Sequence, residues 1–195
     1  MSRQKKELKK GWTTGTCAQA ASRAAAEYLL TGRKREQIKV WIPAGWSLEL
    51  PVEECRPVRY DDRGNVNSVR CGIRKYSGDD PDITNGVVIY STVSMEEGDH
   101  IIIDGGEGVG RVTKPGLDQP VGSAAINTVP RKMIEKEVRE VRDISGYTGG
   151  LKVVIEIPGG QELAEKTFNP RIGIEGGLSV LGTSGIVEPM SKQAL

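Results

Sequence analysis

The stretch GWTTGTCAQAASRAAAEYLLTG, residues 11–32, contains the clearest helix signal in the chain and anchors the prediction of its fold. Its alanine-rich part repeats small and apolar residues at near-helical spacing, and alanine has the highest intrinsic helix propensity. We predict a helix over residues 16–30, with Thr16 and Gln19 as its capping box and Gly32 as its end. The glycine and threonine residues before it turn backbone amides toward the helix start, which suits an anion.

Short runs of β-type composition follow this helix. Turns that contain glycine, proline and aspartate separate the first four runs into two pairs, as in β-hairpins. The expected strands cover residues 38–42, 46–52, 56–60, 67–73, 87–93, 100–104 and 151–157.

A second helix is expected over residues 130–141. Pro130 suits its first turn, and Met133, Ile134, Val138 and Val141 fall on one face, with charged residues on the other. Two main helices beside a mostly antiparallel sheet predict an α+β fold. The strand, glycine turn and helix start after residue 176 read as the first half of a βαβ unit whose partner strand is absent, so we expect a truncated chain.

The composition excludes several classes of protein. The 195 residues carry 27 Lys and Arg against 26 Asp and Glu, so no global field draws the chain to nucleic acid or to an anionic membrane. No run approaches the roughly 18 consecutive apolar residues of a membrane span, and no signal-peptide core follows the charged start. We expect a globular, cytoplasmic protein with no nucleic-acid or membrane partner.

The three cysteines, Cys17, Cys55 and Cys71, are odd in number and lack C-x-x-C spacing. This pattern argues against a disulfide framework and against a zinc ribbon, and it fits a reducing cytoplasm. His100 is the only histidine, and no serine or cysteine pattern accompanies it. We therefore predict neither a catalytic triad nor a metal site.

Two glycine-rich segments could contact a ligand. In IIIDGGEGVG, residues 101–110, an apolar run ends in Asp104 and then in Gly106, Gly108 and Gly110. Adenosylmethionine and dinucleotide sites use such glycines for close approach, but they need a helix next, and Pro115 follows instead. A cofactor loop and a tight turn that embraces another ligand both stay open.

The competing segment is LSVLGTSG, residues 178–185, which runs toward a plausible helix at Pro189. Its Gly182, Thr183 and Gly185 could form a cofactor loop, and the alternative is a buried strand with an ordinary turn.

Charged residues in pinned loops supply the remaining candidates. GDDPD, residues 78–82, could hold a cation, but it lacks the spacing of a calcium loop and reads better as a turn, in which Asp79 or Asp80 could still face a cleft as a polar contact or proton acceptor. Thr113, Lys114 and Arg171 stand among glycines and prolines, so they could be aimed at a carboxylate at little entropic cost. The alternative for them is ordinary solvated surface.

Five blocks, taken together and in order, resemble the CbiD family. They are TTGTCA (13–18), GDDPD (78–82), GVGRVTKPGL (108–117), AIN with VPR (125–131), and NPRIGI (169–174) through GIVEPMS (185–191). The resemblance covers nearly the whole chain, and five blocks are far more specific than one glycine pattern.

The resemblance implies a cobalt-precorrin-5B C1-methyltransferase of the anaerobic cobalamin route, which uses S-adenosylmethionine and works in the prokaryotic cytoplasm. It also implies two domains. Residues 1–175 would resemble the second domain of ribosomal protein S5 and bind the corrinoid precursor, and residues 176–195 would begin a Rossmann-like domain. Family members are longer than this chain, which would then be their amino-terminal part.

The resulting hypothesis is methyl transfer to a ring carbon, for which the protein mainly aligns donor and acceptor. Cobalt would come with the substrate, and the chain could form a homo-oligomer. The macrocycle carries many carboxylates, so the expected substrate contacts are Thr14, Gly15, Arg111, Thr113, Lys114 and Arg171. Asp104 and Asp80 are expected to make polar contacts at the reacting groups, and the donor would use Gly106, Gly108 and Gly110 or Gly182, Thr183 and Gly185.

Two rival functions remain at this point. An S5-like module could bind RNA, but RNA binding predicts a basic face and stacking aromatic residues, whereas only 5% of residues are aromatic. A phosphotransferase would need a phosphate-binding loop, and no G-x-x-x-x-G-K-[ST] sequence is present.

Overall fold

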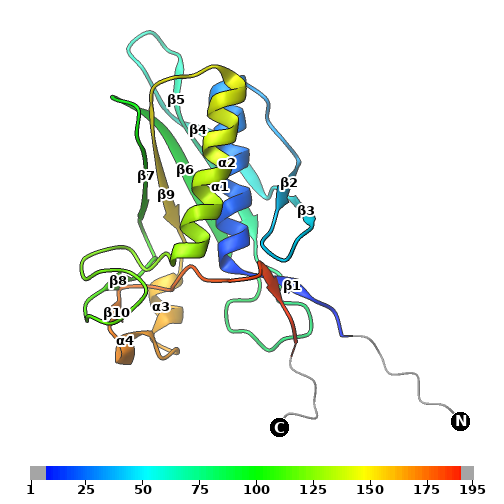
Figure 1. Cartoon of the computed structure of the whole chain (residues 1–195), viewed down its shortest axis with the longest axis vertical. Helices are drawn as coiled ribbons and strands as arrows, with labels where there is room; N and C mark the ends of the chain where they lie inside the picture. The colour runs from blue at the N-terminus through cyan, green and yellow to red at the C-terminus, as the bar shows by residue number, and fades with distance from the viewer. Residues whose placement is uncertain (1–7, 190–195) are drawn as a thin grey trace, which may run out of the picture.

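The computed structural model describes residues 8–189. One layer is a five-stranded sheet and the other is a pair of long helices, which lie side by side along the strands (Figure 1). The helices are α1 (Thr14–Thr31) and α2 (Thr128–Ser145). The sheet has the order β4 (Glu54–Tyr60), β5 (Val66–Arg74), β6 (Val88–Glu96), β9 (Gly150–Glu156) and β7 (Ile101–Gly105).

The first helix begins two residues earlier than predicted. Its N-cap is Thr13, whose side chain accepts a hydrogen bond from the Thr16 N–H, and Gly32 ends it in a left-handed conformation with φ 72°. The predicted end is therefore confirmed, whereas the predicted capping box is wrong. Gln19 is buried inside the fold, where its amide nitrogen donates to the Trp41 carbonyl and to Glu137.

Small side chains allow α1 to lie at the centre of the molecule. Ala18, Ala21 and Ala25 are fully buried, as is expected of a helix that is covered on more than one side. The helix α2 is amphipathic as predicted, with Ile134 and Val138 fully buried. The two helices are also joined by Glu137, which is 2% exposed and pairs with Arg23 of α1.

The sheet is mixed. Strands β4, β5, β6 and β9 pair antiparallel with their neighbours, and β7 joins β9 in parallel at the edge. Both predicted hairpins form, the first between β2 (Gln37–Trp41) and β3 (Ser47–Pro51) and the second between β4 and β5. The α+β class with two main helices is therefore confirmed, and the parallel pair makes the sheet mixed.

Short elements gather at the end of the molecule where α1 begins (Figure 1). They are β1 (Gly11–Trp12) paired with β11 (Ile186–Val187), β8 (Arg111–Val112) paired with β10 (Ile174–Glu175), and the helices α3 (Gly160–Ala164) and α4 (Asn169–Ile172).

The described part of the segment after residue 176 belongs to the main core. Leu178 and Val180 form parallel bridges with Val109 and Ile126, and both are buried. The chain then enters β11 rather than a helix, and the helix expected from Pro189 onward lies outside the described residues. The start of a second domain at residue 176 stays a prediction.

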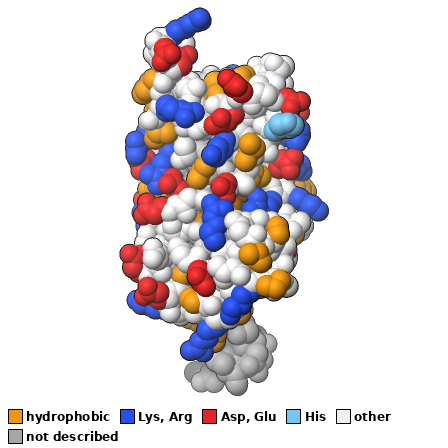
Figure 2. All heavy atoms as spheres, turned by 90° about the vertical axis from the view of Figure 1, so that its left-hand side faces the viewer, with side chains coloured by type: hydrophobic (Ala, Val, Ile, Leu, Met, Phe, Trp, Pro, Cys, Tyr) orange, Lys and Arg blue, Asp and Glu red, His pale blue; other side chains and the backbone are white. Residues whose placement is uncertain are grey.

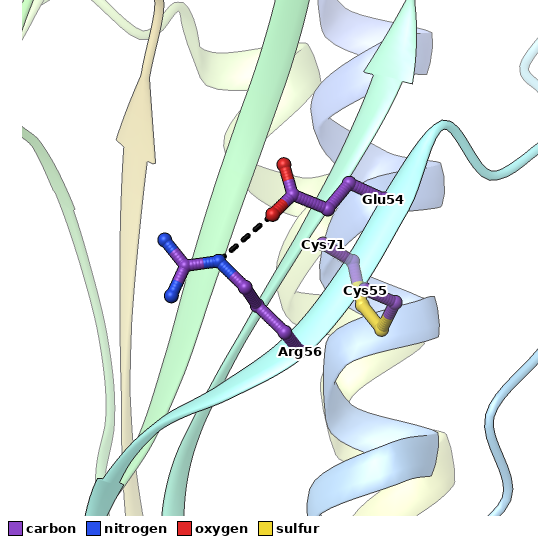
Figure 3. The surroundings of a disulfide bond; sticks show 4 residues. All are labelled: Glu54, Cys55, Arg56 and Cys71. Atoms are coloured by element: carbon purple, nitrogen blue, oxygen red, sulfur yellow. Dashed lines mark hydrogen bonds and ion pairs between the residues drawn. A yellow bond between two sulfur atoms is a disulfide. The ribbon is translucent and has the colours of Figure 1, made fainter.

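The absence of a disulfide was predicted, and this prediction is wrong. Cys55 of β4 and Cys71 of β5 lie opposite each other in the hairpin and are joined by a disulfide bond (Figure 3). Both point toward the helices, whereas Glu54 and Arg56 extend from the other face of β4 and pair with each other. The predicted hairpin began at residue 56 and left Cys55 outside its first strand, whereas β4 begins at Glu54 and places Cys55 opposite Cys71.

No helix among residues 8–189, including the two 18-residue helices, has the length and apolar composition of a membrane span.

Candidate functional site

A pocket of about 340 Å³ opens beside the amino-terminal end of α1. We call it the α1 pocket. Apolar side chains form much of its wall, and hydroxyl, amide and charged groups converge on it, as is common in small-molecule sites. Its lining comprises Thr13, Thr14, Lys75, Asp82, Ile83, Thr84, Thr167, Asn169, Leu178, Ser179, Leu181, Gly182 and Val187.

The start of α1 is fixed to the segment 179–181, which forms one wall of the α1 pocket. The Thr14 hydroxyl accepts a hydrogen bond from the Leu181 N–H at 2.9 Å, and the Gly15 N–H donates to the Leu181 carbonyl at 2.8 Å. A β-carbon at Gly15 would lie 2.8 Å from that carbonyl oxygen and 2.8 Å from the Pro130 ring. Both residues were predicted to bind substrate, and the structure shows that they also position this wall.

A buried ion pair joins the end of β5 to the loop at residues 75–87. Lys75 is 3% exposed, and its ammonium donates to Asp82 at 2.6 Å and to the Ser77 hydroxyl at 2.6 Å. The other Asp82 oxygen accepts hydrogen bonds from the amide and hydroxyl of Thr84. The pair therefore holds Asp82 and Thr84 in the pocket wall.

This environment keeps Asp82 ionised. Burial acts to raise the pKa of its carboxyl group, but the hydrogen bonds from Lys75 and Thr84 and the charge of Lys75 lower that pKa below its ordinary value. The α1 pocket thus contains one ammonium and one carboxylate that neutralise each other.

The segment around α4 forms a part of the wall that is hydrogen-bonded to the segment 179–181. The Asn169 amide nitrogen donates to the Gly177 carbonyl at 3.3 Å and to the Ser179 hydroxyl at 3.2 Å. The backbone carbonyl of Asn169 accepts a hydrogen bond from the Gly173 N–H, but within residues 8–189 no group donates a hydrogen bond to its side-chain oxygen Oδ1. This oxygen is an acceptor that a ligand could use.

Two predicted cationic residues lie together on the outside of this end. The Lys114 ammonium donates to the Arg171 carbonyl at 3.2 Å, and Gly173 leaves room for the Lys114 side chain to lie across the backbone. Both residues are exposed, and within the described part of the chain neither pairs with a carboxylate. We call Lys114 and Arg171 the basic ledge.

The other predicted polar residues beside the ledge are already paired. Arg111 forms an ion pair with Asp104 at 2.7 Å and also donates to the Gly105 carbonyl. Burial acts to raise the pKa of Asp104, but the hydrogen bonds from Arg111 and Gly105 bring it below its ordinary value. The Thr113 hydroxyl donates to Glu175 at 3.3 Å. Pairing of β8 with β10 therefore brings these residues together, and of the four predicted residues Arg111, Thr113, Lys114 and Arg171 only the two of the ledge have a charge without a carboxylate partner in residues 8–189.

The glycines of residues 106–110 pack against the protein itself. Gly108, with φ 72°, crosses Gly160 and Gly177 so closely that a β-carbon on any of the three would overlap backbone atoms of another segment. A β-carbon at Gly110 would overlap Ile174, and Gly108 and Gly110 are buried. We call Gly108, Gly160 and Gly177 the glycine crossing. It gives a structural reason for these glycines, and their contact with a ligand stays a prediction.

The second predicted glycine loop is divided. Gly182 lines the α1 pocket, Thr183 is exposed, and Gly185 is buried against Ile42 and Thr16. Gly106 lies against side chains of Val154 and Glu156, away from the pocket lining.

Asp80 lies in the loop that carries Asp82 but does not line the α1 pocket. Within residues 8–189, no group of three or more His, Cys, Asp or Glu side chains is arranged to hold a metal ion.

The structure thus brings Thr14 and Gly182 to one pocket and Lys114 and Arg171 to one ledge. It adds Lys75, Thr84 and Thr167, which belong to none of the predicted motifs. Asp82 and Asn169 stood inside noted motifs, but no role was predicted for either side chain. Lys75 and Thr84 reach the pocket because the loop that follows β5 folds back on itself, and the sequence around them does not predict this fold.

Comparison with known proteins agrees with the resemblance seen in the sequence. The CbiD family model matches residues 1–189. The Cobalt-precorrin-5B C(1)-methyltransferases of Alkaliphilus metalliredigens and of Thermoanaerobacter sp. are each 52% identical over 97% of this chain, which matches 48% and 49% of those proteins. The chain therefore spans about half the length of these relatives.

A solved structure extends the comparison to three dimensions. The crystal structure of the cobalamin biosynthesis protein (cbiD) from Archaeoglobus fulgidus superposes with a TM-score of 0.73 and 34% sequence identity. The match covers 96% of this chain and 57% of that protein. On the family match and on the identity of these relatives, the chain belongs to the CbiD family.

Proposed function

We propose that this chain is the substrate-holding half of an enzyme that transfers a methyl group from S-adenosylmethionine to C1 of cobalt-precorrin-5B, giving cobalt-precorrin-6A in anaerobic cobalamin biosynthesis. The observation that carries the proposal is the 52% identity, over 97% of the chain, to proteins with the name Cobalt-precorrin-5B C(1)-methyltransferase. Cobalt is part of the substrate in this reaction, so the protein needs no metal site of its own.

In this proposal the basic ledge holds the rim of the macrocycle. Lys114 and Arg171 are exposed cations without a carboxylate partner in the described residues, so they can pair with acidic side chains of a substrate. Exposed pairs are worth only about 0.2 to 1 kcal/mol each, so several contacts must share the binding. Arg111 and Thr113 flank the ledge and would join it, with Arg111 keeping its ion pair with Asp104 and using its remaining N–H donors.

The methyl donor supplies the electrophile when it is bound. The chain's own residues would then have to hold the two reactants in line and to exclude water, without an activated protein nucleophile. Asp104 and Asp80 are proposed as polar contacts at this stage. Because Asp104 has a lowered pKa, it would act as a hydrogen-bond acceptor rather than as an acid.

The finer description of the fold belongs to the same proposal. Residues 1–175 would be an S5-like domain, and residues 176–195 would lead into a Rossmann-like domain. The proposed location is the cytoplasm. The chain is also proposed to form a homo-oligomer, with no particular number of subunits.

RNA binding is the weaker candidate. Seen from the left-hand side of Figure 1, the surface carries interspersed charges of both signs rather than one basic field (Figure 2). The formal net charge of +1 points the same way.

A chimera tests the proposal. Residues 1–189 of this chain would replace the matching half of the Alkaliphilus metalliredigens relative, and the chimera would be incubated with cobalt-precorrin-5B and methyl-labelled S-adenosylmethionine. We expect transfer of one labelled methyl group to the corrinoid, detected by mass spectrometry. A folded chimera that transfers none, beside an Alkaliphilus relative that does, would refute the proposal.

A further inference from the structure

We infer that the α1 pocket takes the nucleoside end of the methyl donor, while the macrocycle stays outside on the basic ledge. This inference rests on the proposed function and assigns it a second site. Lys75, Asp82, Thr84 and Asn169 become residues of that site.

Size is the first argument. A volume of about 340 Å³ lies at the small end of ligand pockets, which run from about 300 to 1,000 Å³. A nucleoside with a short side chain is of that class, whereas a tetrapyrrole with its acidic arms is far larger. The macrocycle could cover the mouth of the pocket but could not enter it.

Charge is the second argument. The buried Lys75 ammonium is neutralised by Asp82 at 2.6 Å, so a carboxylate arm of the macrocycle would find no free cation in the α1 pocket. The unpaired cations, Lys114 and Arg171, are on the ledge. The neutralised α1 pocket therefore suits a neutral ring system, whereas the basic ledge suits a polyacid.

The wall chemistry is the third argument. Leu178, Leu181 and Ile83 offer apolar surface to the faces of a purine ring, and the Asn169 side-chain oxygen Oδ1 is an acceptor without a donor in the described residues. An exocyclic amino group of a purine supplies such a donor. The Thr84 hydroxyl lies in the same lining and donates to Asp82, so its oxygen can still accept a hydrogen bond from a ribose hydroxyl group.

The test uses this chain and S-adenosylhomocysteine as the probe, with titration calorimetry as the readout. We expect saturable binding with one site per chain. Competition identifies the bound end: 5′-methylthioadenosine should displace the probe, and methionine should not. Displacement by methionine alone would overturn the assignment of the nucleoside end.

Two variants locate the site. Leu181 and Ile83 are 49% and 44% exposed and line the α1 pocket, so Leu181→Trp and Ile83→Trp should fill it without disturbing the core. Each should weaken probe binding about tenfold or more, which corresponds to about 1.4 kcal/mol. Ile144→Trp is the matched control, because Ile144 is 72% exposed and lies near the end of α2, outside the pocket lining.

The inference is wrong if the unaltered chain shows no saturable binding, or if every folded pocket variant binds the probe as Ile144→Trp does. Thermal unfolding without ligand identifies the variants that fold. If one of the two pocket variants does not fold, the probe affinity of the other decides the test. The chimera assay separates the two proposals. Methyl transfer by the chimera without probe binding by this chain refutes only the inference, and probe binding without transfer refutes only the proposed function.

Discussion

Replacing Gly108 by alanine is expected to destabilise the fold by about 3 to 4 kcal/mol. Gly108 has φ 72°, and an L side chain in this left-handed conformation costs about 1 to 2 kcal/mol. The added β-carbon would also overlap the Ile157 carbonyl oxygen, which accepts a hydrogen bond from the Gly160 N–H. Separating the glycine crossing would weaken that bond and the bond from the Leu178 N–H to the Gly108 carbonyl, at about 1 kcal/mol each.

Gly116→Ala is the matched control, because Gly116 has φ 92° but no atom within 4 Å of its added β-carbon. It should lose only the conformational part, about 1 to 2 kcal/mol. Urea unfolding of both variants, without any ligand, measures the difference. Equal stabilities would refute the crossing as the reason for glycine at position 108 and would favour a ligand in its place.

Three further tests concern the Lys75–Asp82 ion pair, the lowered pKa values of Asp82 and Asp104, and the Cys55–Cys71 disulfide bond. Lys75→Met should lower the unfolding free energy by about 2 to 4 kcal/mol, because it leaves a partly buried Asp82 without its cation. The double variant Lys75→Met, Asp82→Asn should recover part of this loss. If the losses of the two single variants simply add, the ion pair is contradicted. The folded chain lowers the pKa values of Asp82 and Asp104 below about 4, their value in the unfolded chain, and the stability that this contributes is lost as the pH falls through the folded pKa values. Acid should therefore reduce the unfolding free energy of the unaltered chain more than that of the Asp82→Asn variant. Urea unfolding at a series of acidic pH values measures this difference. Reduction of Cys55–Cys71 should lower the unfolding free energy by about 3 kcal/mol, and thiol titration of the unreduced, denatured chain should find one thiol rather than three.

Local periodicity was enough to predict α1, α2 and both hairpins, because each depends on residues that are close in sequence. The parallel pairing of β7 with β9 was not predictable in this way, since α2 and a long loop separate the two strands. The Cys55–Cys71 pair was missed for a different reason, because the first strand of the predicted hairpin began at residue 56 and left Cys55 out, whereas β4 begins at Glu54.

The glycines of residues 106–110 show a different limit. A glycine that admits a ligand and a glycine that admits another backbone segment have the same sequence signature, since both need the β-carbon to be absent. Only the positions of Gly160 and Gly177 distinguish them. The basic ledge was predictable by residue type, but its lack of acidic partners depends on which carboxylates the fold brings near.

The unpaired charge of the ledge is best tested by the affinity of this chain for cobalt-precorrin-5B across a range of salt concentrations, measured by quenching of tryptophan fluorescence. The double variant Lys114→Gln, Arg171→Gln should bind about five- to tenfold more weakly than the unaltered chain, with a shallower dependence on salt. Equal affinity and equal salt dependence in the two proteins would mean that the macrocycle is held elsewhere.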